Sequence, residues 1–153
     1  MKDYRKEFTV DGKTYALVFN LNVMQEIQEK YGTIEEWGNL TDGYVYDDEG
    51  KRIPKLDSNG KAMTKIVKKE NGENIETTVY EKKEVDIKAL IFGIKAMLNE
   101  AIDIENDNLE IKKPFLSEKQ VGRLITSMGT ESAIENLNDA VIQSTKSDEL
   151  KNE

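Results

Sequence analysis

The chain has 153 residues, with 22 Lys and Arg against 30 Asp and Glu, a formal net charge of −8, and no Cys or His. The absence of Cys excludes disulfides, thiolate nucleophiles and iron–sulfur clusters. The absence of His excludes Ser-His-Asp catalysis and histidine-ligated metal sites. Any catalysis would therefore have to use carboxylates, Lys, Arg, Tyr, Ser or Thr.

Length and charge also limit the domain organisation and the partners. At roughly 150 residues per domain, the chain is predicted to form a single domain over residues 1–153. A net charge of −8 repels nucleic-acid phosphates on average, so we expect no nucleic-acid partner. No apolar run approaches the roughly 20 residues of a membrane helix, so we expect no membrane partner.

Residues 8–19 are predicted to form a β-hairpin. Apolar and polar residues alternate on both sides of Asp11-Gly12, a dipeptide that is typical of a tight hairpin turn. The alternating apolar residues are Phe8, Val10, Tyr15, Leu17 and Phe19. We expect the two strands to bury these side chains against one core.

Two helices are predicted after the hairpin. The first begins after Asn20, whose side chain is suited to an N-cap, and ends before Gly32. Its apolar stripe at helical spacing consists of Val23, Met24, Ile27 and Tyr31. Thr33 and Glu36 match a capping box, which predicts a short second helix through Trp37.

Residues 41–84 have a different character, because helical periodicity disappears and turn dipeptides ending in glycine accumulate. The strongest of these turns is Asn71-Gly72, which lies between two β-rich runs and predicts a hairpin with a type I′ turn. We interpret residues 41–84 as a β-rich insertion or small subdomain. The alternative is a long disordered loop, which is uncommon in a compact domain.

Helical periodicity returns from residue 86 to the acidic stretch at residues 103–108, and again over residues 117–128 and 130–144. Ser117 and Gln120 form a capping box at the start of the middle helix. Residues 145–153 are polar and are predicted to form a frayed tail. The predicted fold class is α+β, with an N-terminal β-hairpin packed on a bundle of about four helices and a β-hairpin-rich insertion.

The candidate motifs for chemistry are incomplete. Gly12-Lys13-Thr14 ends like a phosphate-binding loop, but Glu7 stands where that loop needs its first Gly. The acidic run at residues 103–110 lacks the Gly and the distant Glu of a calcium loop. Lysines between residues 65 and 83 are interleaved with Glu, as on a soluble sheet edge. We predict no catalytic residue, no cofactor and no metal site.

Outside residues 41–84, three blocks of sequence form a recognisable series. The first consists of EFTVDGKTY at residues 7–15, VFNLNVM at 18–24 and QEKYG at 28–32. The second consists of LIFG at 90–93 and MLNEAID at 97–103, and the third is PFLSEKQVGR at 114–123. Together they resemble tail assembly chaperones of tailed phages and prophages of Gram-positive bacteria. The shared features are packing and capping patterns, and residues 41–84 look like an insertion relative to shorter members.

The resemblance implies a non-enzymatic protein of the cytoplasm of the bacterial host. Such proteins bind the tape-measure protein and the tail-tube protein during tail assembly and are generally absent from the finished virion. Many are also made as a longer product by ribosomal frameshifting. The alternative that we keep open is a structural virion component, such as a minor tail or head-completion protein. Self-association is a further open alternative.

Partner contacts are expected at apolar residues near the ends of the predicted elements, namely Trp37, Phe115 and Leu116. Helical segments of a tape measure carry apolar stripes that would aggregate if left free. A small acidic protein can cover such a stripe by helix-in-groove contact and keep the complex dispersed by its charge. The alternative for each of the three residues is ordinary packing in the core or at a helix start.

Overall fold

The computed structural model describes residues 4–151, with side chains described as far as Thr145. The chain divides into two compact units. One unit comprises the residues up to Thr41 together with those from Asp86 onward, and we call it the helical body. The other, Asp42–Val85, we call the β arm.

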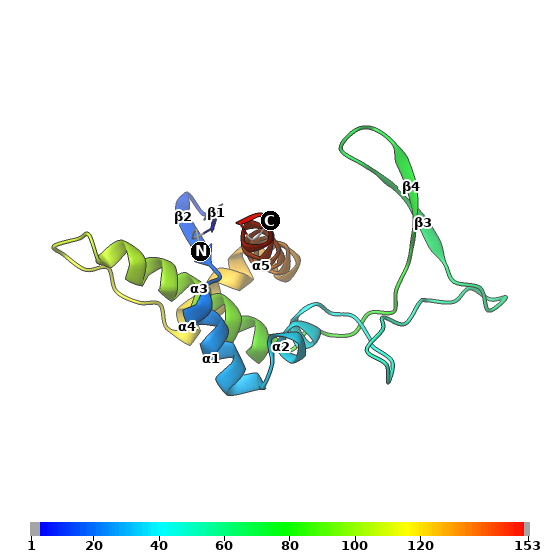
Figure 1. Cartoon of the computed structure of the whole chain (residues 1–153), viewed down its shortest axis with the longest axis horizontal. Helices are drawn as coiled ribbons and strands as arrows, with labels where there is room; N and C mark the ends of the chain where they lie inside the picture. The colour runs from blue at the N-terminus through cyan, green and yellow to red at the C-terminus, as the bar shows by residue number, and fades with distance from the viewer. Residues whose placement is uncertain (1–3, 152–153) are drawn as a thin grey trace. The chain divides into compact units, whose positions relative to one another are not determined.

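In the described residues, the helical body consists of a hairpin followed by five helices (Figure 1). The strands are β1 (Arg5–Val10) and β2 (Lys13–Val18). The helices are α1 (Leu21–Tyr31), α2 (Ile34–Thr41), α3 (Ile87–Asn106), α4 (Glu118–Met128) and α5 (Thr130–Lys151). With the hairpins of the β arm, this confirms the predicted α+β fold.

The N-terminal hairpin has the predicted tight turn. Asp11 and Gly12 have φ angles of 51° and 78°, the two positive values that a type I′ turn requires. The resulting register pairs Phe8 with Tyr15, whose rings stack with their centroids 5.7 Å apart. At the end of β2, Leu17 and Val18 are buried, and β2 packs on α3 and α5 while β1 packs on α4 and α5.

Helix α3 is the central element of the helical body. It packs against β2, α1, α2 and α4 (Figure 1). Its buried residues occupy most of its circumference, as expected for a helix surrounded by other elements. They are Ala89, Leu90, Gly93, Ile94, Ala96, Met97, Leu98, Ala101 and Asn106. The Asp86 side chain caps its first turn by accepting from the N–H of Ala89 at 2.9 Å.

The predicted helix starts at Asn20 and Ser117 are confirmed. The Asn20 side chain accepts from the N–H of Val23, and Ser117 and Gln120 form both hydrogen bonds of a capping box. Two helix ends differ from the prediction. Helix α2 continues through Gly38 to Thr41, and the α5 backbone is helical to Lys151, where we expected a frayed tail from residue 145. Residues 152–153 of that tail lie outside the described residues.

The β arm contains strands β3 (Thr64–Lys68) and β4 (Asn74–Thr78), preceded by two smaller hairpins. Three chain segments meet at each of two closed rings of backbone hydrogen bonds. In the first ring, Val45 donates to Glu81, Glu81 to Ile53 and Ile53 to Val45, at 3.3, 2.8 and 3.0 Å. In the second ring, Lys55 donates to Val79, Val79 to Met63 and Met63 to Lys55, each at 2.8 Å. The rings satisfy backbone groups that strands alone would leave unpaired.

The two smaller hairpins use the same turn, at a ten-residue period that we did not detect in the sequence. Oδ1 of Asp47 accepts from the N–H groups two and four residues later, both at 2.9 Å. Oδ1 of Asp57 does the same, at 2.8 and 3.0 Å. The prediction of a type I′ turn at Asn71-Gly72 is wrong. Among the described non-glycine residues only Asp11 has a positive φ, so Asn71 instead forms a local side-chain turn to Glu73.

Candidate functional site

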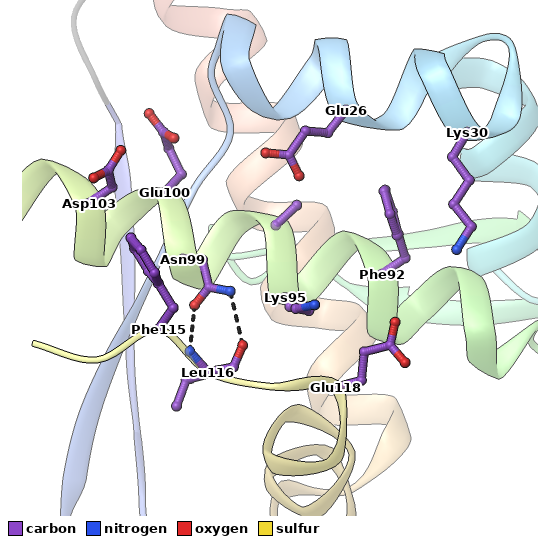
Figure 2. Close-up of a pocket in the computed structure, with 11 residues that line it drawn as sticks. Glu26, Lys30, Phe92, Lys95, Asn99, Glu100, Asp103, Phe115, Leu116 and Glu118 are labelled. Carbon is purple, nitrogen blue, oxygen red and sulfur yellow. Dashed lines mark hydrogen bonds between the residues drawn. The ribbon is translucent and has the colours of Figure 1, made fainter.

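The segment that joins α3 to α4, residues 107–116, turns back after α3, and two asparagines of α3 hold its last part, residues 113–116. We call this segment the strap. The Asn106 side chain accepts from the N–H of Lys113 at 2.8 Å and donates to its C=O at 3.0 Å. Asn99 makes the same pair of bonds to Leu116, at 2.8 and 3.0 Å (Figure 2). Each carboxamide therefore holds a backbone residue much as a neighbouring strand would.

We call these two asparagine side chains the clamps, and their spacing on α3 matches the spacing of the strap residues that they bind. Asn99 and Asn106 are seven residues apart on α3, which is about 10.5 Å along a helix axis. Lys113 and Leu116 are three residues apart, which is about 10 Å in an extended chain. The strap can therefore satisfy both clamps with its backbone extended, running antiparallel to α3.

Apolar side chains of the strap are exposed. Ile111 is 88% exposed, Phe115 56% and Leu109 37%. Exposed single apolar residues are ordinary, but several on one short segment are typical of a binding surface. Of these three residues, only Phe115 lies between the clamped residues Lys113 and Leu116, while Leu109 and Ile111 lie in the loop before them.

A pocket of about 490 Å³ lies on one side of the strap (Figure 2). We call it the acidic pocket, because four carboxylates and two lysines line it. Its lining residues are Glu26 and Lys30 of α1, Phe92, Lys95, Ala96, Asn99, Glu100 and Asp103 of α3, and Phe115, Leu116 and Glu118. Glu100 accepts hydrogen bonds from the side chains of Asn20 at 2.9 Å and Asn22 at 3.1 Å. Its volume is within the range of small-ligand and peptide sites.

A second hollow of about 460 Å³ lies between the hairpin, α3 and the strap, and we call it the hairpin groove. Phe115 and Leu116 line this groove as well as the acidic pocket. At its edge, the Glu105 carboxylate bonds Arg5 at 2.6 Å and Lys113 at 2.8 Å. This ion-pair network joins β1, α3 and the strap.

Glu105 is expected to make the helical body sensitive to acid. Hydrogen bonds from Lys113 and then from Arg5 hold the pKa of this carboxyl below its usual value of 4.5. A depressed folded-state pKa contributes stability above the unfolded pKa, and the contribution disappears as the pH falls through the folded value. Glu105→Gln should therefore lower the free energy of unfolding at neutral pH and flatten its fall below about pH 4.5. Urea unfolding at neutral and acid pH measures both effects.

Glu110→Gln provides the control, because Glu110 is exposed and forms no ion pair in the described part of the chain. It should leave the pH dependence of unfolding unchanged. If both variants flattened the acid-induced fall in the free energy of unfolding equally, the Glu105 network would have no specific role in acid sensitivity.

The three residues that the sequence analysis selected have different surroundings. Trp37 is buried at 2% exposure, and its indole N–H donates to the C=O of Ala89 at 3.0 Å. This is the core packing that we kept as the alternative, and it leaves no surface for a partner. Phe115 is exposed, and Leu116, the last residue of the strap, is half-buried. The structure thus brings Phe115 and Leu116 to one site and places Trp37 elsewhere.

Sequence reasoning missed the two asparagine clamps. The only available signal was a pair of asparagines seven residues apart on the apolar helix, and Asn106 lay in a stretch that we interpreted as a helix end. Within residues 4–151, no group of three or more Asp and Glu is placed to hold a metal ion. No helix in the described chain is both long enough and apolar enough to cross a membrane.

Comparisons with protein-family models, with curated proteins and with solved structures gave no significant match.

Proposed function

We propose that this protein is a tail assembly chaperone of a tailed phage or prophage. In this role it acts without catalysis in the cytoplasm of the bacterial host, where it binds the tape-measure protein and the tail-tube protein. The observation that carries the proposal is the strap, which exposes Ile111 and Phe115 and whose last residues, Lys113 to Leu116, are held by two asparagines. The resemblance of the three sequence blocks supports the same role.

The strap has the physical properties that a chaperone surface needs. Exposed apolar side chains gain free energy when a client covers them, at about 25 cal/mol per Å² of apolar area. A backbone that is already ordered loses little conformational entropy on binding. The strap therefore provides an apolar contact that is accessible in the free protein and needs no folding step.

The charge distribution suits a chaperone that keeps its client dispersed. Ten acidic and nine basic residues lie in residues 42–85, so the β arm has a net charge of −1 and the rest of the chain −7. The acidic charge is therefore concentrated in the unit that contains the strap. A strongly charged complex repels its neighbours and resists aggregation.

The test is coexpression of the full chain with fragments of the tape-measure protein encoded beside it. The chain should keep soluble at least one fragment that precipitates when expressed alone, and the two should co-purify. The double variant Ile111→Ser with Phe115→Ser should lose most of this effect, because it removes the two most exposed apolar side chains of the strap. The measurement is the soluble fraction of each fragment.

The matched control is Leu21→Ser with Ile142→Ser, which removes apolar side chains of 66% and 52% exposure elsewhere on the helical body. The control should keep the activity of the unaltered chain. If no fragment becomes soluble with the unaltered chain, the chaperone proposal is wrong. Stoichiometric amounts of the protein in purified particles would instead identify a structural virion component.

A further inference from the structure

The acidic pocket extends along one face of α3. Its α3 residues, from Phe92 to Asp103, recur at intervals of three and four, which places them in one stripe. The stripe spans twelve residues, so its two ends are about 16 Å apart along the helix. Helix α1 borders it on one side, and the strap and the start of α4 on the other (Figure 2). A partner helix of about three turns would match the length of this stripe.

The apolar part of the pocket comes from two different elements. Phe92 belongs to α3 and packs edge-on against Tyr31, with ring centroids 5.6 Å apart. Phe115 belongs to the strap and is 56% exposed, and Ala96 and Leu116 also contribute. These groups provide contact area for one or two apolar side chains of a partner.

The charges around the pocket are unbalanced. Four carboxylates face two lysines, and Lys30 already lies over the Phe92 ring at 4.6 Å. No ion pair among the described residues involves Glu26, Asp103 or Glu118. Burial, followed by the repulsion of Glu100 and Glu29, raises the pKa of Glu26 above its usual value, and the smaller attraction of Lys95 offsets only part of this. A cation from a partner would offset this repulsion, whereas an acidic partner would increase it.

We propose that the acidic pocket binds a basic amphipathic helix of a protein partner, with apolar residues of that helix on Phe92 and Phe115 and its Lys or Arg residues beside Glu26, Asp103 and Glu118. This inference deepens the proposed function and rests on it to the extent that the helix is a segment of the tape-measure client. It adds the shape and the charge of the segment that binds. Acidic or neutral helices of the same client are bound weakly or not at all.

The test uses the purified full chain and two probes. The first probe is a model helix of about 14 residues with Leu on one face and Lys on the other, and the second has Glu in place of Lys. The pocket variant carries Glu26→Gln, Asp103→Asn and Glu118→Gln, which remove three charges and keep the side-chain shapes. The control variant carries Glu35→Gln, Glu131→Gln and Glu135→Gln, which remove three charges from exposed sites outside the pocket.

The unaltered chain should bind the Lys helix and not the Glu helix, with an affinity that falls as salt is added. Three weakened charge pairs reduce affinity by about tenfold or more in the pocket variant. The control variant has the same net charge and should lose less than about threefold. Equal losses in the two variants would overturn the inference, because binding would then follow net charge alone.

The same variants separate this inference from the proposed function. If a tape-measure fragment remains soluble with the pocket variant as well as with the unaltered chain, the chaperone role is supported and the pocket is not its binding site. If the Lys helix binds at the pocket but no tape-measure fragment is recovered, the pocket inference is supported and the chaperone role is wrong.

Discussion

Gly93→Ala is expected to destabilise the helical body by about 2 kcal/mol. A Cβ at this position would lie 2.2 Å from Cζ2 and 2.8 Å from Cε2 of Trp37. The indole cannot move away easily, because it is buried and its N–H donates to Ala89. Overpacking of this severity costs about 3 kcal/mol, and the better helix propensity of Ala recovers about 1 kcal/mol. Urea unfolding measures the difference.

Gly122→Ala is the matched control, because Gly122 also lies inside a helix. The nearest atom to its added Cβ is Cδ1 of Ile91 at 3.8 Å, an ordinary contact. This variant should therefore gain about 0.5–1 kcal/mol from helix propensity alone. If both variants shift stability in the same direction, the close approach of Trp37 to α3 is not what restricts residue 93.

A double-mutant cycle isolates the Trp37 contact. Trp37→Phe removes the atoms that Gly93→Ala would clash with, although it also removes the hydrogen bond to Ala89. Gly93→Ala should therefore cost less in the Trp37→Phe background than in the unaltered chain. The difference between the two costs is the coupling energy of the pair, which we expect to be about 1–3 kcal/mol.

The sequence predicted well the parts of the fold that local chemistry determines. Asp11-Gly12 supplies two residues suited to positive φ, so its turn type follows from two adjacent positions. The capping box of Ser117 and Gln120 likewise closes within four residues. These signals do not depend on the rest of the chain, so they can be recognised without a structure.

Contacts between distant segments could not be predicted in the same way. Trp37 precedes Gly93 by more than fifty residues, and nothing in either local sequence indicates that the indole occupies the space above the glycine. The rings of the β arm each join three segments, so no pairwise hairpin pattern contains them. Asn71-Gly72 has the dipeptide of a type I′ turn, but a longer turn with Lys69 and Glu73 replaces it.

The candidate site was predicted in part for a related reason. Apolar residues near the ends of elements are ambiguous, because they contact either the core or a partner. Trp37 is buried by a contact with a distant helix, whereas Phe115 stays exposed on a segment that two side-chain clamps hold. Neither outcome can be predicted from the residues that flank Trp37 or Phe115. The acidic pocket is assembled from α1, α3, the strap and α4, so its charge imbalance exists only in the folded chain.

The clamps themselves provide the second large effect that we expect. Asn106→Ala removes two hydrogen bonds and leaves a cavity at a position that is 7% exposed, so it should destabilise the helical body by about 2 kcal/mol. Asn99→Ala should cost about 1–2 kcal/mol for the same two bonds to Leu116. Asn138→Ala, at an exposed site on α5, should change the free energy of unfolding by less than about 0.5 kcal/mol.

Amide hydrogen exchange assigns these losses to the strap. Asn99→Ala should remove protection at the Leu116 amide, and Asn106→Ala at the Lys113 amide, because each amide donates to that side chain alone. Asn99→Asp keeps the acceptor for the Leu116 N–H but places a carboxylate against its C=O, so it should retain much of the protection while still losing stability.

If both amides stay protected in the alanine variants, packing of the strap rather than the clamps holds it on α3. The exposure of Phe115 would then not depend on the asparagines. Loss of protection together with weaker client binding would show that the clamps present the strap to its partner.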